Sequence, residues 1–482
     1  MNRRLVVRIV TAMLAVAMLA VPASALAGKN GGGKKKAKAL VVCKHGCKYR
    51  TIQKAVNKAG KTKKKNDVVK VKPGKYVEGV QALGKKYNGL TIMGTNKNAR
   101  KTILEGKNAQ LPGGVGIANN GIEIADAKNV TVKNMWVRNF ATNGVFWHDT
   151  NTDNAKTTCQ NAVAKNVDVS FNRSYGLFMF GCEGGSFNKS EGWGHGDSAY
   201  YVGATPFQDD PKKTVLKNLD SYENVLGYSG TNSKYLVIKD SDFYNNGIGL
   251  VPNTLDSEPF EPTGDSVIKD NNIFWNNFNY FLPDSRVKTV SNGLGEIAPG
   301  VVLQYPTGIG VALFGANGWT VKDNAIFGNF MWGVAMFSDP VGNEGDDAIS
   351  RNNQVLDNEM GRNGTDTNGH YDLWTDGSGE GNCFEGNDSE TKAPDESAPG
   401  PNHATIEQLY PSCPVPGGTQ PNPGATGGSA GNQYLQLQVL LPYAVSTPPE
   451  NQECKWNRHS HPKFEKFEPL TVPGFDPSGC PA

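Results

Sequence analysis

The stretch LVIKDSDFYNNGIGLV, residues 236–251, contains the elements that decide the fold. A basic residue is followed by Asn or Asp, then by a stretch that contains apolar residues and closes on Asn, and then by a Gly-led apolar segment. The basic-Asx pair recurs at Lys133-Asn134, Lys165-Asn166, Lys217-Asn218, Lys239-Asp240, Lys269-Asp270, Lys322-Asp323 and Arg351-Asn352. Repeats of about this length predict a solenoid, in which each unit buries its apolar side chains against its neighbours.

Each repeat contains three short alternating segments separated by bends. Val130–Val132 and Met135–Val137 precede a Gly-led segment at 144–147, and similar segments begin at Gly176, Gly227, Gly310 and Gly333. Three short strands in roughly 22 residues predict a triangular coil. Asn suits the bends, because it tolerates the left-handed backbone conformation, and equivalent Asn side chains can stack between coils.

An amphipathic helix is predicted before the first coil. Ile52, Ala55, Val56 and Ala59 fall on one helical face, Thr51 can cap the start, and Gly60 ends the pattern. A solenoid needs a cap over its first open core, and this helix would provide one.

The segments 51–56 and 69–76, TIQKAV and VKVKPGKY, resemble the opening of right-handed parallel β-helix proteins of the pectin-lyase-like superfamily. The segment 196–203, GDSAYYVG, is similar to a coil of secreted bacterial β-helix proteins. The resemblance covers about residues 40–390. It implies an all-β, right-handed parallel β-helix of roughly ten coils with an N-terminal capping α-helix, and a substrate groove along one outward face.

The composition divides the chain into five parts. A basic start, an apolar stretch and a small-x-small site at Ala25-Leu26-Ala27 predict a signal peptide, and no later segment reaches the roughly 20 apolar residues of a membrane span. We expect a secreted, extracellular protein, and association with the cell wall is an open alternative. The predicted parts are a signal peptide (1–27), a Gly/Lys-rich leader (28–41), a β-helix (42–390), a Pro/Gly-rich linker or wrap (391–431) and a disulfide-bonded tail (432–482).

Charge is distributed unevenly along the chain. Residues 28–65 carry fourteen Lys and Arg and no acid, whereas the rest of the mature chain has 32 basic and 46 acidic residues, a net charge of −14. A basic arm of this kind can attract anionic cell-wall polymer, or it can be a flexible, solubilising leader. We expect a monomer with no specific nucleic-acid partner.

All eight cysteines lie in the mature chain, as in proteins of an oxidising compartment. Their spacing favours the pairs Cys43–Cys47, Cys159–Cys182, Cys383–Cys413 and Cys454–Cys480. Metal binding would need clustered Cys or His ligands, and that spacing does not occur, so no metal is expected. A Ca²⁺ site of the pectate-lyase kind has only loosely grouped acids to support it.

Alignment on the third strand predicts an outward column of Phe146, Phe178 and Tyr201, continued by smaller residues such as Ser229 and Gly249. His148 and Phe180 begin a neighbouring column. Such stacked rings can bind sugar faces, or they can pack beneath an insertion. The substrate-binding candidates are Phe146, His148, Phe178, Phe180 and Tyr201.

Polar residues near this column are candidates for chemistry. Glycoside hydrolysis needs two carboxyl groups, and Asp149 or Asp153 could approach Glu183 on the next coil. The catalytic candidates are Asp149, Asp153, Glu183, His195 and Asp197. Asn151-Thr152-Asp153, Gly194-His195-Gly196 and Asp209-Asp210 resemble pieces of polygalacturonases, but their order differs from that family, which argues against that identity.

Three functions remain open at this point. The first is a polysaccharide lyase, hydrolase or epimerase with its groove on coils 145–210. The second is a non-catalytic protein that binds cell-wall polymer. A third possibility is an export-side maturation factor similar to the β-helix protein of copper-enzyme assembly. It is disfavoured, because the chain has no His/Cys/Met cluster.

Overall fold

The computed structural model describes residues 39–62, 67–111, 116–152, 156–278, 280, 287, 295–298, 301–303, 305–338, 349–369, 371–375, 379–388 and 413. The predicted signal peptide, most of the leader, and the linker and tail apart from Cys413 lie outside these residues. So do Asp153 and the predicted pair Cys454–Cys480.

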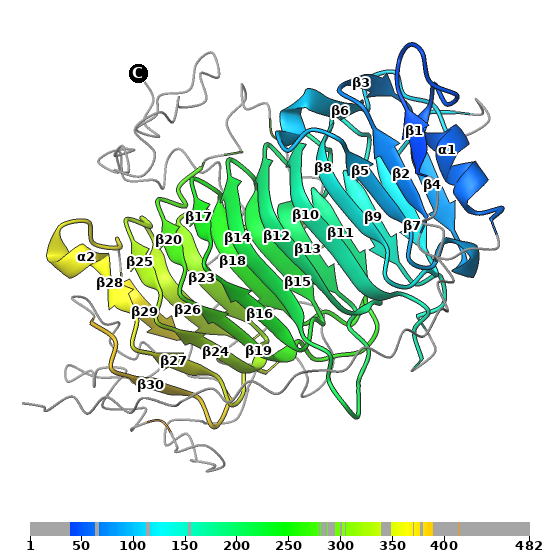
Figure 1. Cartoon of the computed structure of the whole chain (residues 1–482). Coiled ribbons are helices and arrows are strands. Elements are labelled where there is room, and N and C mark those ends of the chain that lie inside the picture. Colours follow the sequence, from blue (N-terminus) through cyan, green and yellow to red (C-terminus); the bar gives the residue numbers. More distant parts are fainter. Residues whose placement is uncertain are drawn as a thin grey trace, which may run out of the picture. The chain divides into compact units, whose positions relative to one another are not determined.

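The protein is a right-handed parallel β-helix, as predicted. Its described strands form two stacked sheets in which neighbouring coils pair in parallel, and Figure 1 shows the coils following one another along the axis. The ten-stranded sheet, here called sheet B, contains β4 (Val80–Leu83), β7 (Ile122–Ala125), β9 (Val145–His148), β11 (Leu177–Phe180), β13 (Ser198–Gly203), β15 (Leu226–Thr231), β18 (Ile248–Asn253), β23 (Ile309–Phe314), β26 (Trp332–Phe337) and β29 (Tyr371–Thr375).

The second sheet, here called sheet A, bends within each coil. It contains β1 (Leu40–Val42), β2 (Val68–Val71), β3 (Gly74–Val77), β5 (Thr91–Gly94), β6 (Thr102–Glu105), β8 (Thr131–Arg138), β10 (Gln160–Ser170), β12 (Glu183–Trp193), β14 (Thr214–Tyr222), β16 (Leu236–Lys239), β17 (Asp242–Tyr244), β19 (Gly264–Lys269), β20 (Asn272–Phe274), β24 (Asn317–Lys322), β25 (Ala325–Phe327), β27 (Gln354–Leu356), β28 (Glu359–Met360) and β30 (Cys383–Glu385). A separate antiparallel pair joins β21 (Gly295–Ala298) to β22 (Val301–Leu303).

The recurring basic-Asx pair forms the bend of sheet A at six of its seven positions. The Asx residue has a positive φ in every pair, from 50° at Asp240 to 56° at Asp270. The lysines before the bend lie in register, as Lys239 with Lys269 and Lys269 with Lys322. Asn and Asp adopt this left-handed conformation more readily than other non-glycine residues, which explains their recurrence here.

One member of the predicted repeat was assigned to the wrong position. Lys322 pairs with Leu356, so the next bend residue is Asp357, whose φ is 49°. Arg351 instead forms a bridge with Asn317, at the start of β24. The prediction failed because the bend constrains the Asx residue, whereas the residue before it need not be basic.

The predicted helix caps the first coils. α1 (Ile52–Ala59) begins at Thr51, whose hydroxyl accepts a hydrogen bond from the Lys54 amide, and ends at Gly60. Its four predicted apolar residues are buried in the main core. The Glu78 carboxylate accepts hydrogen bonds from the first helical amides, Ile52 and Gln53, at 2.8 and 3.0 Å, which satisfies donors that the helix itself leaves unpaired.

Buried asparagines connect the coils at their turns. In the series here called the central asparagine ladder, each side-chain amide donates to the Oδ1 atom of the next member at 2.9–3.1 Å. The members are Asn224, Asn246, Asn276, Asn329 and Asn368. A second series joins Asn271, Asn324, Asn358 and Asn387. These bonds satisfy buried polar groups, as a closely packed interior requires.

Three of the four predicted disulfides are present: Cys43–Cys47, Cys159–Cys182 and Cys383–Cys413. Cys159 and Cys182 precede β10 and β12, so this disulfide joins adjacent coils. Cys413 is attached to β30 in the last described coil. Within the described ranges no helix has the length and apolar character needed to cross a membrane.

Candidate functional site

Three rings form a continuous row on the outward face of sheet B. Register places Phe146 beside Phe178 and Phe178 beside Tyr201, as predicted. The Phe146 and Phe178 rings stack at 4.3 Å, and the Phe178 and Tyr201 rings meet edge to face at 4.8 Å. Phe146 is half-buried, whereas Phe178 and Tyr201 are 9% and 2% exposed. We call these residues the aromatic row.

The column beyond the row differs from the prediction at one position. Ser229 pairs with Val251, so Val251 takes the outward place that was assigned to Gly249. The shift arose because β18 places Ile248 and Leu250 toward the core. Small and aliphatic residues therefore continue the column after Tyr201.

A polar cluster lies at the Phe146 end of the row. His148 stacks on Phe146 at 4.2 Å, and its Nε2 atom lies 3.3 Å from Oε1 of Glu123. Gln81 donates a hydrogen bond to the other Glu123 oxygen at 2.9 Å. The hydrogen bond with His148 is the largest influence that lowers the pKa of Glu123, so this carboxylate is ionised at neutral pH.

A carboxyl pair lies at the Tyr201 end. The Tyr201 hydroxyl donates to the Glu258 carboxyl, 2.8 Å from both oxygens. Tyr175 lies beside the row, with its ring 4.6 Å from both Phe178 and Tyr201, and its hydroxyl interacts with Asp197. Asp197 is 5% exposed and its Oδ1 atom has no hydrogen-bond partner.

Both carboxyl groups of this pair titrate near neutrality. Burial raises the pKa of Asp197 to about 7, and the charge of Glu258 adds to this shift. Burial also raises the pKa of Glu258 to about 7, against the opposing hydrogen bond from Tyr201. A carboxyl group with a raised pKa can hold a proton at neutral pH, which general acid catalysis requires.

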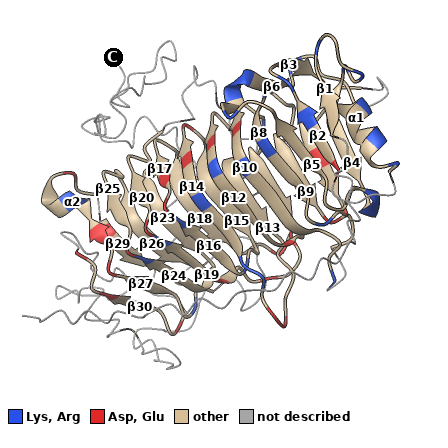
Figure 2. Cartoon of the chain, in the orientation of Figure 1, with Lys and Arg blue, Asp and Glu red and all other residues tan. Residues whose placement is uncertain are grey.

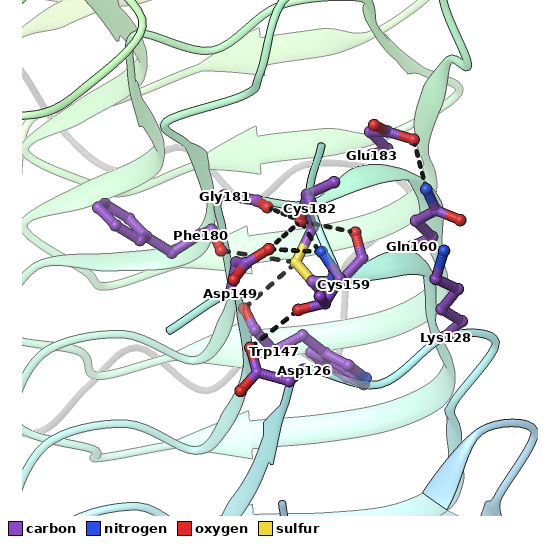
Figure 3. Close-up of a disulfide and its surroundings, with 12 residues drawn as sticks. Asp126, Lys128, Trp147, Asp149, Cys159, Gln160, Phe180, Gly181, Cys182 and Glu183 are labelled. Atoms are coloured by element: carbon purple, nitrogen blue, oxygen red, sulfur yellow. Dashed lines mark hydrogen bonds between the residues drawn. A yellow bond between two sulfur atoms is a disulfide. The ribbon is translucent and has the colours of Figure 1, made fainter. Parts of the chain in front are cut away.

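The other predicted catalytic residues do not join this pair. Asp149 is buried and accepts hydrogen bonds from the Thr157 hydroxyl at 2.6 Å and from the amides of Asn151 and Thr158. It thereby holds the loop that leads to Cys159. Figure 3 shows Asp149 and Glu183 on opposite sides of the Cys159–Cys182 disulfide.

Glu183 begins β12 on sheet A. Its carboxylate accepts a hydrogen bond from Gln160 at 2.8 Å, the contact drawn in Figure 3, and lies 3.3 Å from the Lys212 ammonium. These contacts bridge coils on a different sheet from the aromatic row. Phe180 lies beside His148 in the second outward column, as predicted.

His195 is fully buried inside the coil. Its backbone amide donates to Oδ1 of Asn224 at 2.9 Å, and Nδ1 lies 3.4 Å from the carbonyl of Asn172. Burial lowers the pKa of His195 to about 4, so the ring is neutral at physiological pH. This position belongs to the turn that carries the central asparagine ladder.

Three residues of the site, Glu258, Tyr175 and Glu123, were not predicted from the sequence. Glu258 is 57 residues from Tyr201 and lies outside the strands, so periodicity gave no signal for it. Tyr175 precedes a Gly-led strand and could have been found from its position next to Gly176. The described residues contain no group of His, Cys, Asp and Glu suited to hold a metal ion.

A family model described as pectinesterase matches residues 39–148, a minor part of the chain. No curated protein matches the sequence. The solved A-module of mannuronan C-5 epimerase AlgE4 from Azotobacter vinelandii is 15% identical, with a TM-score of 0.49 and with 70% of this chain and 82% of that chain covered. An alginate lyase from Paenibacillus sp. str. FPU-7 is 12% identical, with a TM-score of 0.36 and coverage of 69% and 97%. The fold and the family match confirm the resemblance to pectin-lyase-like β-helix proteins.

Proposed function

We propose that this chain is an exported polysaccharide-active protein that binds a glycan along the aromatic row and cleaves it with Glu258 and Asp197. The observation that carries the proposal is the carboxyl pair, with both pKa values raised to about 7, at one end of that row. The resemblance to polysaccharide-active β-helix proteins and the disulfides, which are typical of exported proteins, support it.

The two ends of the row suit different tasks. Phe146, the half-buried ring of the row, can stack on the apolar face of a sugar, and the polar groups of Glu123, His148 and Gln81 can fix the orientation of a bound chain through hydrogen bonds. At the other end, the protonated member of the pair donates a proton to the glycosidic oxygen, while the ionised member activates a water molecule or attacks the sugar. Glu258 is the half-buried member and therefore the more accessible one.

The test is an assay of reducing-end release on a panel of neutral glucans and polyuronates. Glu258→Gln and Asp197→Asn keep the shape of each side chain and remove the titrating proton, so each should reduce cleavage by roughly a hundredfold or more. Glu183→Gln is the matched control, because its carboxylate lies on sheet A. Full activity of both test variants would refute the catalytic assignment.

Non-catalytic glycan binding is the second candidate, and the low exposure of Asp197 favours it. In that case the wild-type protein retains glycan in affinity electrophoresis and releases no reducing ends from any member of the panel. A wild-type protein that neither retains glycan nor releases reducing ends would rule out both candidates.

A further inference from the structure

Sheet A carries a second ordered row on its outward face. The rings of Trp193, Tyr222, Tyr244, Phe274 and Phe327 stack from coil to coil, with centroids 5.0–5.7 Å apart. Trp136 lies 5.7 Å from Trp193 at the start of the series. We call these six residues the outer ring stack.

An acidic row runs beside the outer ring stack. Glu191, Asp220 and Asp242 each lie two residues before a ring of the stack, and Asp168, the register partner of Trp136, begins the row. Register places Asp168 beside Glu191, Glu191 beside Asp220 and Asp220 beside Asp242. Figure 2 shows acidic positions following one another across neighbouring strands from β10 to β17. Arg100 pairs with Asp168 and Glu191 at 3.2 and 2.8 Å at the first end of this row.

The later half of this face is buried although it points away from the core. Phe243 and Ile273 face the main core, so the adjacent residues Tyr244 and Phe274 face outward, yet they are only 3% and 0% exposed. Tyr244 and Phe274 belong to a separate apolar cluster. Burial of outward rings is expected where another segment covers them.

Part of this covering comes from the turn after β28. The Arg362 guanidinium lies 5.1 Å from the Phe327 ring centroid, and Asp366 accepts a hydrogen bond from the Trp275 indole at 2.7 Å. The burial extends further along the row, to Asp242 at 4% and Tyr244 at 3% exposure. Earlier in the series, Trp193, Glu191 and Asp220 remain partly exposed.

We propose that the C-terminal segment 454–467 of this chain docks on the outer ring stack and the acidic row. This segment, CKWNRHSHPKFEKF, contains four Lys and Arg, three aromatic residues and one acid. Its cations complement the acidic row, and its rings match the apolar stack. The basic leader 28–41 offers cations but no aromatic residue, so it matches only one of the two rows.

The segment can reach this face. Cys413 is held at β30 by its disulfide, and Lys455 lies 42 positions further along the chain, a span of up to roughly 140 Å when extended. The coil of β17 lies four coils before that of β30 in sheet A, a distance of about 20 Å.

Zero-length carbodiimide cross-linking of the full-length, monomeric protein, read by mass spectrometry, tests the docking. Lys455, Lys463 and Lys466 should link to Glu191, Asp220 or Asp242. The double variant Glu191→Lys/Asp220→Lys should reduce the links to Asp242, whose carboxylate it retains, at least tenfold, whereas Asp209→Lys/Asp210→Lys, at two exposed loop acids, should leave them unchanged.

Other outcomes identify other occupants and overturn the proposal. Links from leader lysines in place of tail lysines would assign the face to the leader. Links that form only between molecules, and rise with concentration, would assign it to a second copy. Tail lysines that link only to other acids would leave the face to a different partner. Circular dichroism of each variant verifies that the β-helix is intact.

Discussion

His195 occupies a place in the central asparagine ladder directly before Asn224. Its amide donates to Oδ1 of Asn224, the same bond that the Asn224 amide makes to Asn246. The imidazole cannot reproduce the next bond in the series, and both His195 Nε2 and Asn172 Nδ2 are buried without a hydrogen-bond partner. The ladder is therefore interrupted between the coils of β10 and β12.

Replacing His195 with Asn should stabilise the protein. An Asn side chain at this position can accept from Asn172 and donate to Asn224, so Asn172 Nδ2 gains a partner and the unpaired His195 Nε2 is removed. Each unsatisfied group costs about 1–3 kcal/mol, and we expect a net gain of about 1–2 kcal/mol in the free energy of unfolding, measured by urea denaturation. Asn246→His is the reciprocal control and should lower stability. An unchanged or lower stability of His195→Asn would show that the ring contributes packing that outweighs the missing bonds.

The same variant should change the acid sensitivity. The pKa of His195 is about 4 in the folded protein, below the ordinary value of 6.5. Between these values the unfolded chain binds the proton and the folded chain does not, so wild-type stability falls as the pH drops from 6.5 toward 4, by up to about 1.4 kcal/mol per pH unit. The difference between His195→Asn and wild type should thus be larger at pH 5 than at pH 7.5. A difference that is constant with pH would contradict this account.

Asp197 should show the opposite dependence. Its folded pKa is about 7 and its ordinary value 3.8, because burial disfavours the charge. The contribution of protonated Asp197 to the free energy of unfolding is complete below about pH 4, and it is lost as the pH rises through 7. Asp197→Asn cannot ionise, so it should be more stable than wild type at pH 8, by on the order of 2–4 kcal/mol, and similar to it at pH 4. Thermal unfolding at the two pH values measures this, and parallel curves would argue against a buried, protonated Asp197.

Phe146→Ala should weaken glycan binding while leaving the fold intact. Phe146 is the half-buried member of the aromatic row and stacks on both Phe178 and His148. We expect a roughly tenfold higher Kd, about 1.4 kcal/mol, by calorimetry. Phe207→Ala removes a ring that is 56% exposed and lies outside the row, so its Kd should equal that of wild type. Equal losses in both variants would indicate a general effect on the protein.

Replacing Cys159 and Cys182 together with Ala should lower the free energy of unfolding. The disulfide closes a loop of 23 residues, which corresponds to about 3 kcal/mol in the chain-entropy description. A reducing agent should lower the Tm of wild type toward that of the double variant. The Tm of the double variant should fall less, because the variant lacks this disulfide. A double variant as stable as the oxidised wild type would show that the folded coils carry no benefit from the link.

Features that recur from coil to coil could be predicted from the sequence, whereas site residues that occur once could not. The bends at Asn134 and Asp323, the capping helix and the row from Phe146 to Tyr201 all depend on periodicity, and each is present. Glu258 lies in a loop, and only the folded chain brings it to Tyr201. His195 was proposed as catalytic on its glycine neighbours, but the turn places its ring inside the coil, where Asn residues stand in later coils.

The Cys159–Cys182 disulfide joins the two coils between which the asparagine ladder is interrupted. The covalent bond thus reinforces the interface at which side-chain hydrogen bonds are missing. In a solenoid, where stability depends on contacts between neighbours, a bond that is missing at one interface affects the two coils that share it. Reduction of the disulfide should therefore loosen the turn that these two coils share, while the long pairing of β10 with β12 still connects the N-terminal and C-terminal coils.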